Sequence, residues 1–306
     1  MKYFPKNENA FNVPEDYEQA FFKDPMLTTD LTASIMLKTK GIIDKTDIRI
    51  LKYIYETKFC TGDQLMRFCK YKGIEEDEVE ARLNIMFTNT LINKFGFVEE
   101  ENYRGSLPDD IQIYYCLHDG GKHLLDNFSG EDFIDWQAGY VVCHVKNVVK
   151  TLIGAEFYTQ FYTAETPLVY HTKRPTYSIK SDRFTGGDVY SMSKDGVPYY
   201  YAVDTFLSSD RTNMVRNKLR GYESVFNTQI WKRYYVDGGQ PPILIFVTDN
   251  DKSAAALTKE ISSQFRFGNG FLISTKDRLL TGLTKSGSLL IYNSEKNSLE
   301  PANLNF

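Results

Sequence analysis

The sequence predicts an α+β protein with two domains, and three observations lead to this fold class. The chain has 306 residues, which exceeds the usual length of one domain. Residues 45–128 have the spacing of three helices followed by two strands. Residues 129–292 have the order helix, three strands, helix, strand, without an internal repeat. With 42% hydrophobic and 25% charged residues, both domains can bury ordinary cores.

The two ends of the chain fall outside these domains. Residues 1–44 contain Pro5, Pro14 and Pro25 among acidic and aromatic residues, which is typical of an arm that packs on the body or is ordered by a partner. Residues 293–306 are polar and form the expected C-terminal tail. The first residues lack the apolar stretch of a signal peptide, and no run has the length of a membrane span. We therefore expect a cytoplasmic protein without membrane contact.

Composition limits the kinds of site that the chain can carry. The formal net charge of −4 gives no basic signature across the whole chain, so nucleic-acid binding would have to come from local patches. The four cysteines form no CxxC pair and no set with metal-ligand spacing. Such cysteines are typical of buried free thiols in a reducing compartment rather than of disulfides or metal ligands. They are Cys60, Cys69, Cys116 and Cys143.

The three helices predicted within residues 45–128 have recognisable starts. Thr46 is the expected N-cap of the first helix. Thr61 and Gln64 form a capping-box pattern at the start of the second. The third begins near Glu76, and its expected inward residues are Val79, Leu83, Met86 and Phe87. Strands are expected over residues 95–100 and 111–117, and apolar residues alternate along the second. Three helices followed by a two-stranded ribbon predict a winged helix, a variant of the helix-turn-helix.

A winged helix of this kind predicts contacts with DNA. The third helix enters the major groove, where arginine can pair with guanine and asparagine with adenine. The residues expected on its outward side are Arg82, Asn84, Asn89 and Lys94. Arg67, Lys70 and Lys72, from the second helix, are expected to contact phosphates.

An acidic run at the start of the third helix opposes this interpretation. Glu75 to Glu78 are consecutive carboxylates, which favour the helix dipole but repel a DNA backbone. A winged helix that binds another protein instead of DNA therefore stays as the alternative.

The second domain is organised around residues 183–226, in the order strand, tight turn, strand, helix. Lys194-Asp195-Gly196 separates two strand-like runs, and Asp-Gly is typical of a two-residue hairpin turn. Caps for the helix are expected at Ser208, Ser209 or Asp210. One stripe of this helix contains Arg211, Val215, Lys218, Tyr222 and Phe226. A lysine within a largely apolar stripe needs a partner.

Further elements complete the second domain. The expected ones are a helix within residues 130–163, strands over 170–179, 243–247 and 271–273, a helix beginning near Ser253 and a hairpin arm over 286–292. The continuous apolar run at 243–247 suits a strand buried on both faces. Asp249 or Asp251 is the expected cap of the helix that follows it.

Three short motifs of the second domain resemble the replication-relaxation family of plasmid and conjugative-element proteins. The motifs are Gly186-Gly187-Asp188 at a strand start, Tyr201-Ala202-Val203-Asp204 at a strand end and Lys218-Leu219-Arg220-Gly221-Tyr222 in a helix. The resemblance extends over roughly residues 45–280. It implies a winged helix joined to an αβββαβ domain, a degenerate relative of the PD-(D/E)xK nuclease fold.

The resemblance also implies where a metal site would lie. In the PD-(D/E)xK arrangement, two acids on neighbouring strands hold Mg²⁺, and a lysine two residues after the second acid assists the reaction. Asp188 fits the first position, whereas Ala202 and Asp204 stand in the second-acid and lysine positions. Lys218 can reach in from the helix. Asp188, Asp204 and Lys218 are thus the candidate catalytic residues, and Asp188 and Asp204 the candidate ligands of Mg²⁺, if the site is active. The favoured alternative is a structural ion pair of Asp204 with Lys218, which Arg211 can join, without any cofactor.

These expectations lead to a non-catalytic DNA-binding accessory protein of a plasmid or integrative conjugative element. It would act in replication, its control or conjugative DNA processing. This expected role follows from the resemblance. The implied partners are double-stranded DNA, a relaxase or replication proteins, and a second copy of the chain. A Mg²⁺-dependent endonuclease or nickase is one alternative. A protein-interaction scaffold or transcription regulator is the other.

Overall fold

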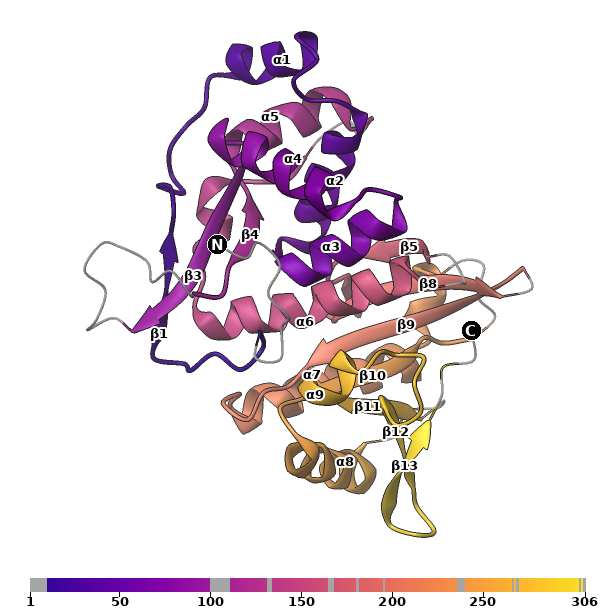
Figure 1. Ribbon diagram of the computed structural model, residues 1–306. Coiled ribbons are helices and arrows are strands. Elements are labelled where there is room, and N and C mark those ends of the chain that lie inside the picture. The colour runs from indigo at the N-terminus through magenta and orange to yellow at the C-terminus, as the bar shows by residue number, and fades with distance from the viewer. Residues whose placement is uncertain are drawn as a thin grey trace. The chain divides into compact units, whose positions relative to one another are not determined.

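The computed structural model describes residues 10–99, 111–130, 134–164, 168–179, 182–194, 196–235, 240–265, 267, 270–302 and 304. The chain divides into two compact units, Met1–Ala155 and Glu156–Phe306, each with its own sheet (Figure 1). Both units combine helices and strands, so the predicted α+β class is confirmed. The units divide within the helix α6 (Val145–Tyr162), beyond the boundary expected after residue 128. None of the described helices is long and apolar enough to span a bilayer.

Three helices follow one another in unit 1, in the order predicted. They are α2 (Lys45–Thr57), α3 (Gly62–Tyr71) and α4 (Glu76–Thr88). The capping box at the start of α3 is confirmed: Gln64 N donates to Thr61 Oγ1 at 3.1 Å, and Thr61 N donates to Gln64 Oε1 at 3.0 Å. On α4 the residues Val79, Leu83 and Met86 are buried as predicted, and Phe87 is half-buried.

The cap predicted for α2 is wrong. Asp44, not Thr46, is the N-cap, and its carboxylate accepts from Thr46 N at 2.6 Å and from Asp47 N at 3.2 Å. Asp47 in turn accepts from Asp44 N at 2.8 Å, which completes a reciprocal capping box. A carboxylate two residues earlier reaches backbone N–H groups that the Thr46 hydroxyl, already inside the helix, cannot reach.

An antiparallel sheet accompanies these helices, in the strand order β1-β3-β4-β2. Its strands are β1 (Tyr17–Phe21), β2 (Phe59–Thr61), β3 (Ile92–Glu99) and β4 (Tyr114–Leu117). β3 begins three residues before the predicted start, and Glu100 lies outside the described residues. All four residues of β4 are buried, since β4 is an inner strand and Tyr114 also donates to Ala10 O at 3.0 Å.

Residues 10–44, predicted as an arm, are folded into unit 1, whereas residues 1–9 lie outside the described residues. β1 pairs with β3 along its whole length, and α1 (Leu31–Thr39) contacts α5 (Asp119–Phe128). Between them, the Lys23 ammonium donates to Thr88 O at 3.1 Å and to Thr90 Oγ1 at 3.2 Å. A cation from the expected arm thus satisfies the negative C-terminal end of α4.

Unit 2 is built on a mixed sheet in the strand order β13-β12-β11-β10-β9-β8-β5 (Figure 1). The strands are β5 (Leu168–Thr172), β8 (Asp188–Lys194), β9 (Val197–Thr205), β10 (Ile243–Thr248), β11 (Phe271–Thr275), β12 (Leu289–Asn293) and β13 (Ser298–Ala302). β9, β10 and β11 run parallel, and the other neighbours pair antiparallel. Parallel neighbours need crossover connections, which α7 (Thr212–Asn227) and α8 (Asp251–Gln264) supply.

The hairpin predicted around Lys194-Asp195-Gly196 is confirmed. Lys194 pairs with Val197, and Gly196 has φ = +77°, a conformation that favours glycine in a two-residue turn. Asp195 lies outside the described residues. The register of the whole β8–β9 ladder follows from this turn.

Three predictions in unit 2 differ from the structure. The strand expected over residues 170–179 is divided into β5 and β6 (Thr176–Ile179), and β6 leaves the main sheet to pair with β7 (Asp182–Thr185). The chain turns between them at Arg174, with φ = +41°, and at Pro175. The hairpin arm expected over 286–292 is part of the sheet as β12, and the expected polar tail supplies β13.

The caps expected in unit 2 are also wrong. Arg211 is the N-cap of α7 and makes no side-chain cap bond, while Asp210 accepts from Leu207 N at 2.8 Å and closes the preceding turn. Asn250, between the two predicted aspartates, caps α8 by accepting from Ser253 N at 3.0 Å. Neighbouring cap-forming residues compete, and the path of the incoming chain selects among them.

Both faces of the sheet in unit 2 are covered. On one face, α7 and α8 bury a cluster that includes Ala202, Leu244, Phe246, Leu219, Tyr222 and Leu257. On the other face, the part of α6 inside unit 2 packs Phe161 against Tyr190 and Tyr201, with ring centroids 5.0 and 5.5 Å apart. Side chains one residue apart on β8 or β9 therefore lie in different environments.

Gly187 provides a test of the close approach between β8 and β9. A Cβ at Gly187 would lie 1.9 Å from Val203 O, a backbone atom that cannot move without disturbing the ladder. We expect Gly187→Ala to lower the free energy of unfolding by about 2–3 kcal/mol, measured by urea denaturation. Gly139→Ala is the control, because a Cβ there meets nothing within 4 Å and should change stability by less than about 0.5 kcal/mol. Equal stabilities of the two variants would contradict this close approach.

Candidate functional site

The Asp204 carboxylate, at the end of β9, accepts hydrogen bonds from three donors, two on α7 and one on β9 itself. Lys218 Nζ lies 2.8 Å from Oδ2 and 3.0 Å from Oδ1. The Tyr222 hydroxyl donates to Oδ2 at 2.9 Å, and Thr205 N donates to Oδ1 at 3.0 Å. The carboxylate has an exposed fraction of only 8%, so these bonds replace nearly all of its hydration.

The sequence brings these groups together through α7. Lys218 and Tyr222 are four residues apart, so both side chains lie on one side of the helix. Leu219 and Val225 are buried beside them and press that side against the sheet. Tyr222 also accepts from Gly187 N at 2.6 Å, so its hydroxyl joins the entry of β8 to the end of β9.

Burial, together with the charge of Asp204, raises the pKa of Tyr222 well above its ordinary value of 10.0. The hydroxyl therefore stays protonated and remains a donor throughout the neutral range. The ion pair predicted between Asp204 and Lys218 is thus present as part of a network that includes a buried tyrosine. The role of Tyr222 was not predicted, although its spacing from Lys218 was a signal for it.

Asp188 lies on the opposite face of the sheet from Asp204. In the β8–β9 ladder Asp188 pairs with Val203, and directly paired residues project to the same face. Asp204, the next residue after Val203, must project to the other face. The Asp188 carboxylate accepts from Arg174 N at 3.1 Å instead.

The prediction that Asp188 and Asp204 bind one Mg²⁺ ion is therefore wrong, as is the catalytic set of Asp188, Asp204 and Lys218. Ala202 shares the face of Asp204 but has no oxygen to offer. Among the described residues, no three His, Cys, Asp or Glu side chains are grouped so that they could hold a metal ion. The Lys218 ammonium neutralises the Asp204 carboxylate and occupies the place that a cation would take.

Arg82, predicted to read DNA from α4, is engaged by three carboxylates. Its guanidinium lies 3.0 Å from Asp44 Oδ2, 3.0 Å from Asp47 Oδ1 and 2.7 Å from Glu78 Oε1. The Asp47 side chain is 3% exposed, so burial raises the pKa of Asp47 even though Arg82 acts to lower it. Arg82 therefore joins the start of α2 to α4 and is not directed outward.

Lys94 was expected near the end of the third helix, and that placement is wrong. It belongs to β3, has an exposed fraction of 5%, and its ammonium lies 4.0 Å from the centre of the Phe87 ring. Burial lowers the pKa of Lys94, and the nearby positive charge of Lys23 lowers it further. Phe87 and Phe22 surround the ammonium as cation–π partners, which keeps it from phosphates.

The other predicted DNA contacts are closer to the surface. Lys70 and Lys72 are exposed at the end of α3, and Asn84 is exposed on α4. Arg67 pairs with Asp63 at 2.9 Å, and Asn89 donates to Ile85 O at 2.8 Å at the end of α4. The structure thus leaves Lys70, Lys72 and Asn84 on an accessible surface next to the acidic start of α4.

The cysteines agree with the expectation of free thiols. Cys60, Cys69 and Cys116 are buried and Cys143 is half-buried, and all four are free. Burial raises the pKa of Cys69 to about 12, so its thiol is neither a nucleophile nor a ready metal ligand.

Comparisons with known proteins give no relative for this arrangement: no family model, no curated protein and no solved structure matches the chain.

Substitution of Arg82 distinguishes its structural role from a role in DNA binding. Arg82→Ala leaves the buried Asp47 carboxylate without its cation, so we expect the free energy of unfolding to fall by about 3 kcal/mol while DNA affinity stays the same. Arg67→Ala breaks a half-buried pair near the surface and should cost at most about 1 kcal/mol. Urea denaturation and a DNA titration are measured on both variants. A stable Arg82→Ala protein with weakened DNA binding would restore Arg82 as a DNA contact.

Lys218 tests the Asp204 network. Lys218→Met removes the cation of a buried carboxylate, and we expect the free energy of unfolding to fall by about 2–4 kcal/mol. Combining it with Asp204→Asn removes the charge as well and should recover part of this loss. Lys259→Met, at an exposed position of α8, is the control and should change stability by less than about 0.5 kcal/mol. A Lys218→Met protein of unchanged stability that Mg²⁺ stabilises would contradict a purely structural pair.

Proposed function

We propose that this protein is a non-catalytic DNA-binding accessory protein of a plasmid or integrative conjugative element. It would act in replication, its control or conjugative DNA processing, with double-stranded DNA as its ligand. The element and the process come from the resemblance to the replication-relaxation family. The order of elements and the accessible side chains support the DNA-binding part.

The observation that carries this proposal is the order α2-β2-α3-α4-β3-β4 in unit 1. β2 pairs with β4 and β4 with β3, so a three-helix module is closed by a ribbon, as in a winged helix. Lys70, Lys72 and Asn84 are exposed on α3 and α4, the helices that such a module presents to DNA. Lysine contacts to phosphates position the protein, and asparagine can read adenine.

Unit 2 supports a non-catalytic role. Apart from the β6–β7 hairpin inserted between β5 and β8, the main elements follow in the order α6-β5-β8-β9-α7-β10, with β9 and β10 parallel. This order supports the proposed αβββαβ nuclease-like fold. We propose that this scaffold is retained without its reaction. Asp204 has Lys218 and Tyr222 where an active site would hold a hydrated cation, and Asp188 lies on the other face.

An acidic surface favours a second candidate, a protein-interaction module. Glu75, Glu76, Asp77 and Glu78 are all exposed at the start of α4. Of these only Glu78 is engaged by Arg82. Such a surface repels DNA and suits a basic partner protein.

A salt-dependent DNA titration tests the proposal. We expect the full chain to bind duplex DNA, with affinity falling steeply between about 0.05 M and about 0.2 M salt. Lys70→Gln combined with Lys72→Gln should weaken binding about 5-fold to 10-fold by removing two phosphate contacts. Fluorescence anisotropy gives the affinities. Lys40→Gln with Lys45→Gln, at two exposed positions of the same unit, is the charge-matched control and should bind like the parent.

Two outcomes would contradict the proposal. Absence of DNA binding at low salt would leave the protein-interaction module. Mg²⁺-dependent nicking of supercoiled DNA, lost in Asp188→Ala, would show an enzyme.

A further inference from the structure

Charge is divided unequally between the two units. Unit 1 contains 18 Lys and Arg against 25 Asp and Glu, a formal charge of −7, and unit 2 contains 18 against 15, a charge of +3. DNA carries a dense negative charge, and its nonspecific affinity comes largely from cations that neutralise phosphates. Unit 1, which contains the helix predicted to read DNA, therefore has a net charge that repels DNA, unlike unit 2. Strong binding to the DNA backbone would therefore have to come from cations of unit 2.

Most of the basic charge near α7 lies between Arg216 and Arg233. This stretch has five Lys or Arg residues and one acid, Glu223. Lys218 is bound to Asp204, and Arg216 pairs with Glu260 at 2.6 Å. The remaining three are Arg220 on the outer side of α7, and Lys232 and Arg233 on η3 (Ile230–Arg233), and all three are exposed.

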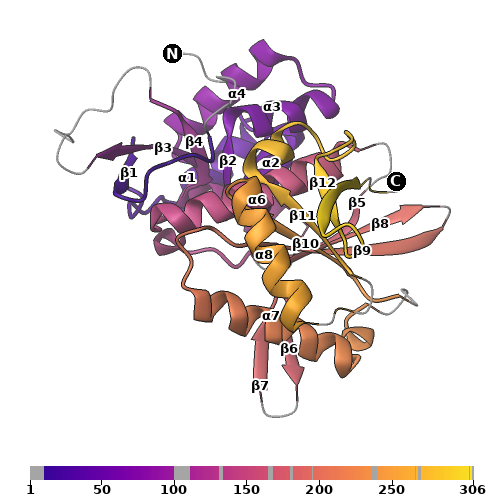
Figure 2. The same cartoon turned by 90° about the horizontal axis from the view of Figure 1, so that it is seen from below.

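The β6–β7 hairpin adds a further arginine to this surface. Phe184 of β7 packs over Gly221, where an added Cβ would lie 2.1 Å from the ring, so β7 lies directly against α7 beside Arg220. Arg183, which precedes Phe184, projects to the opposite, exposed side of the hairpin. Figure 2 shows β6 and β7 next to α7, in agreement with their contacts.

A second contact joins the hairpin to η3. Ser178, the residue paired with Arg183, donates its backbone N–H to the Tyr234 hydroxyl at 3.3 Å. Tyr234 follows Arg233 directly, and its ring meets Tyr177 edge-on at 4.9 Å. Arg183, Arg220 and Arg233 therefore come from three elements that packed aromatic rings hold together.

The three guanidinium groups are available to a ligand. Within the described part of the chain, none of Arg183, Arg220 and Arg233 takes part in an ion pair, whereas Lys232 donates to Gln229 Oε1 at 2.6 Å. Side chains around them are largely neutral donors: Asn213, Asn217, Thr176, Ser178 and Thr185 are exposed. Within the described residues of β7, α7 and η3, the acids are Asp182 and Glu223, fewer than the four cations. Amides and hydroxyls are, with arginine, the common donors to phosphate oxygens.

We propose that Arg183, Arg220, Lys232 and Arg233 form a basic surface that binds the sugar–phosphate backbone of DNA without reading its sequence. This inference rests on the proposed DNA-binding function and assigns the main backbone contact to unit 2 rather than to unit 1. Arginine suits this role, because its planar guanidinium donates to two phosphate oxygens at once. Reading of sequence would remain with α3 and α4.

The test replaces three arginines in the full chain. We expect Arg183→Gln, Arg220→Gln and Arg233→Gln together to weaken duplex binding about 100-fold at low salt. The slope of log affinity against log salt should fall by about 3, equally for two unrelated sequences. Replacing the same arginines by lysine preserves the charge and should keep binding within about 5-fold of the parent. Thermal unfolding of each variant verifies that exposed substitutions leave the fold intact.

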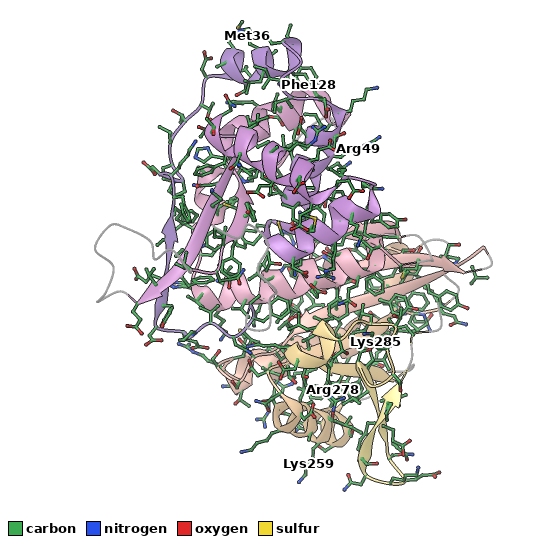
Figure 3. All side chains as sticks on the ribbon, in the orientation of Figure 1. Met36, Arg49, Phe128, Lys259, Arg278 and Lys285 are labelled. Atoms are coloured by element: carbon green, nitrogen blue, oxygen red, sulfur yellow. The ribbon has the colours of Figure 1, made fainter. Side chains whose placement is uncertain are left out.

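The control removes equal charge elsewhere in unit 2. Lys252, Lys259 and Lys285 are exposed, and Figure 3 labels the last two. Changing these three to Gln should leave both affinity and slope close to those of the parent. If the parent binds DNA but the arginine variant binds with the same slope, the basic surface is overturned and the DNA-binding function stands. If the parent does not bind DNA, both are overturned.

Discussion

The structure of unit 2 depends on one register, that of the β8–β9 hairpin. The two-residue turn pairs Lys194 with Val197 and, six residues further along each strand, Asp188 with Val203. Asp204 must then face α7, inside an apolar layer, where a lone carboxylate would be costly. Lys218 and Tyr222, on one side of the same helix, offset this cost with an ion pair and a hydrogen bond to Asp204. The same register separates the two acids that a shared metal site would need.

Two basic residues of unit 1 that were predicted to contact DNA, Arg82 and Lys94, stabilise the fold instead. Arg82 connects the start of α2 to α4 through Asp44, Asp47 and Glu78, and Lys94 is enclosed by aromatic rings. Both side chains lose their hydration, and both are compensated locally. In contrast, Arg183, Arg220 and Arg233 keep their charge exposed. Exposure rather than the number of cations decides which surface attracts an anion.

Local patterns anticipated much of the fold. The helices of residues 45–88, the Thr61–Gln64 capping box and the Asp195-Gly196 hairpin depend on neighbouring residues, and the structure has all three. Caps at Thr46, at Ser208 to Asp210 and at Asp249 or Asp251 were wrong, because several adjacent residues were chemically suitable. Residues 10–44 showed no clear period, since β1 and α1 owe their stability to β3 and α5.

The sequence by itself contained the β8–β9 register and thus the separation of Asp188 from Asp204, because a two-residue turn and the alternation of side chains suffice to count it. The shared Mg²⁺ site, predicted from the family resemblance, did not use that count. The sequence also indicated the pairing of Lys218 with Asp204, since a lysine in an apolar stripe requires an acid nearby. Only the tertiary structure decided that Arg82 pairs with carboxylates and that Lys94 is buried. It also decided the grouping of Arg183, Arg220 and Arg233. Their partners lie on other elements, and no periodicity along one segment specifies which distant charge will be within reach.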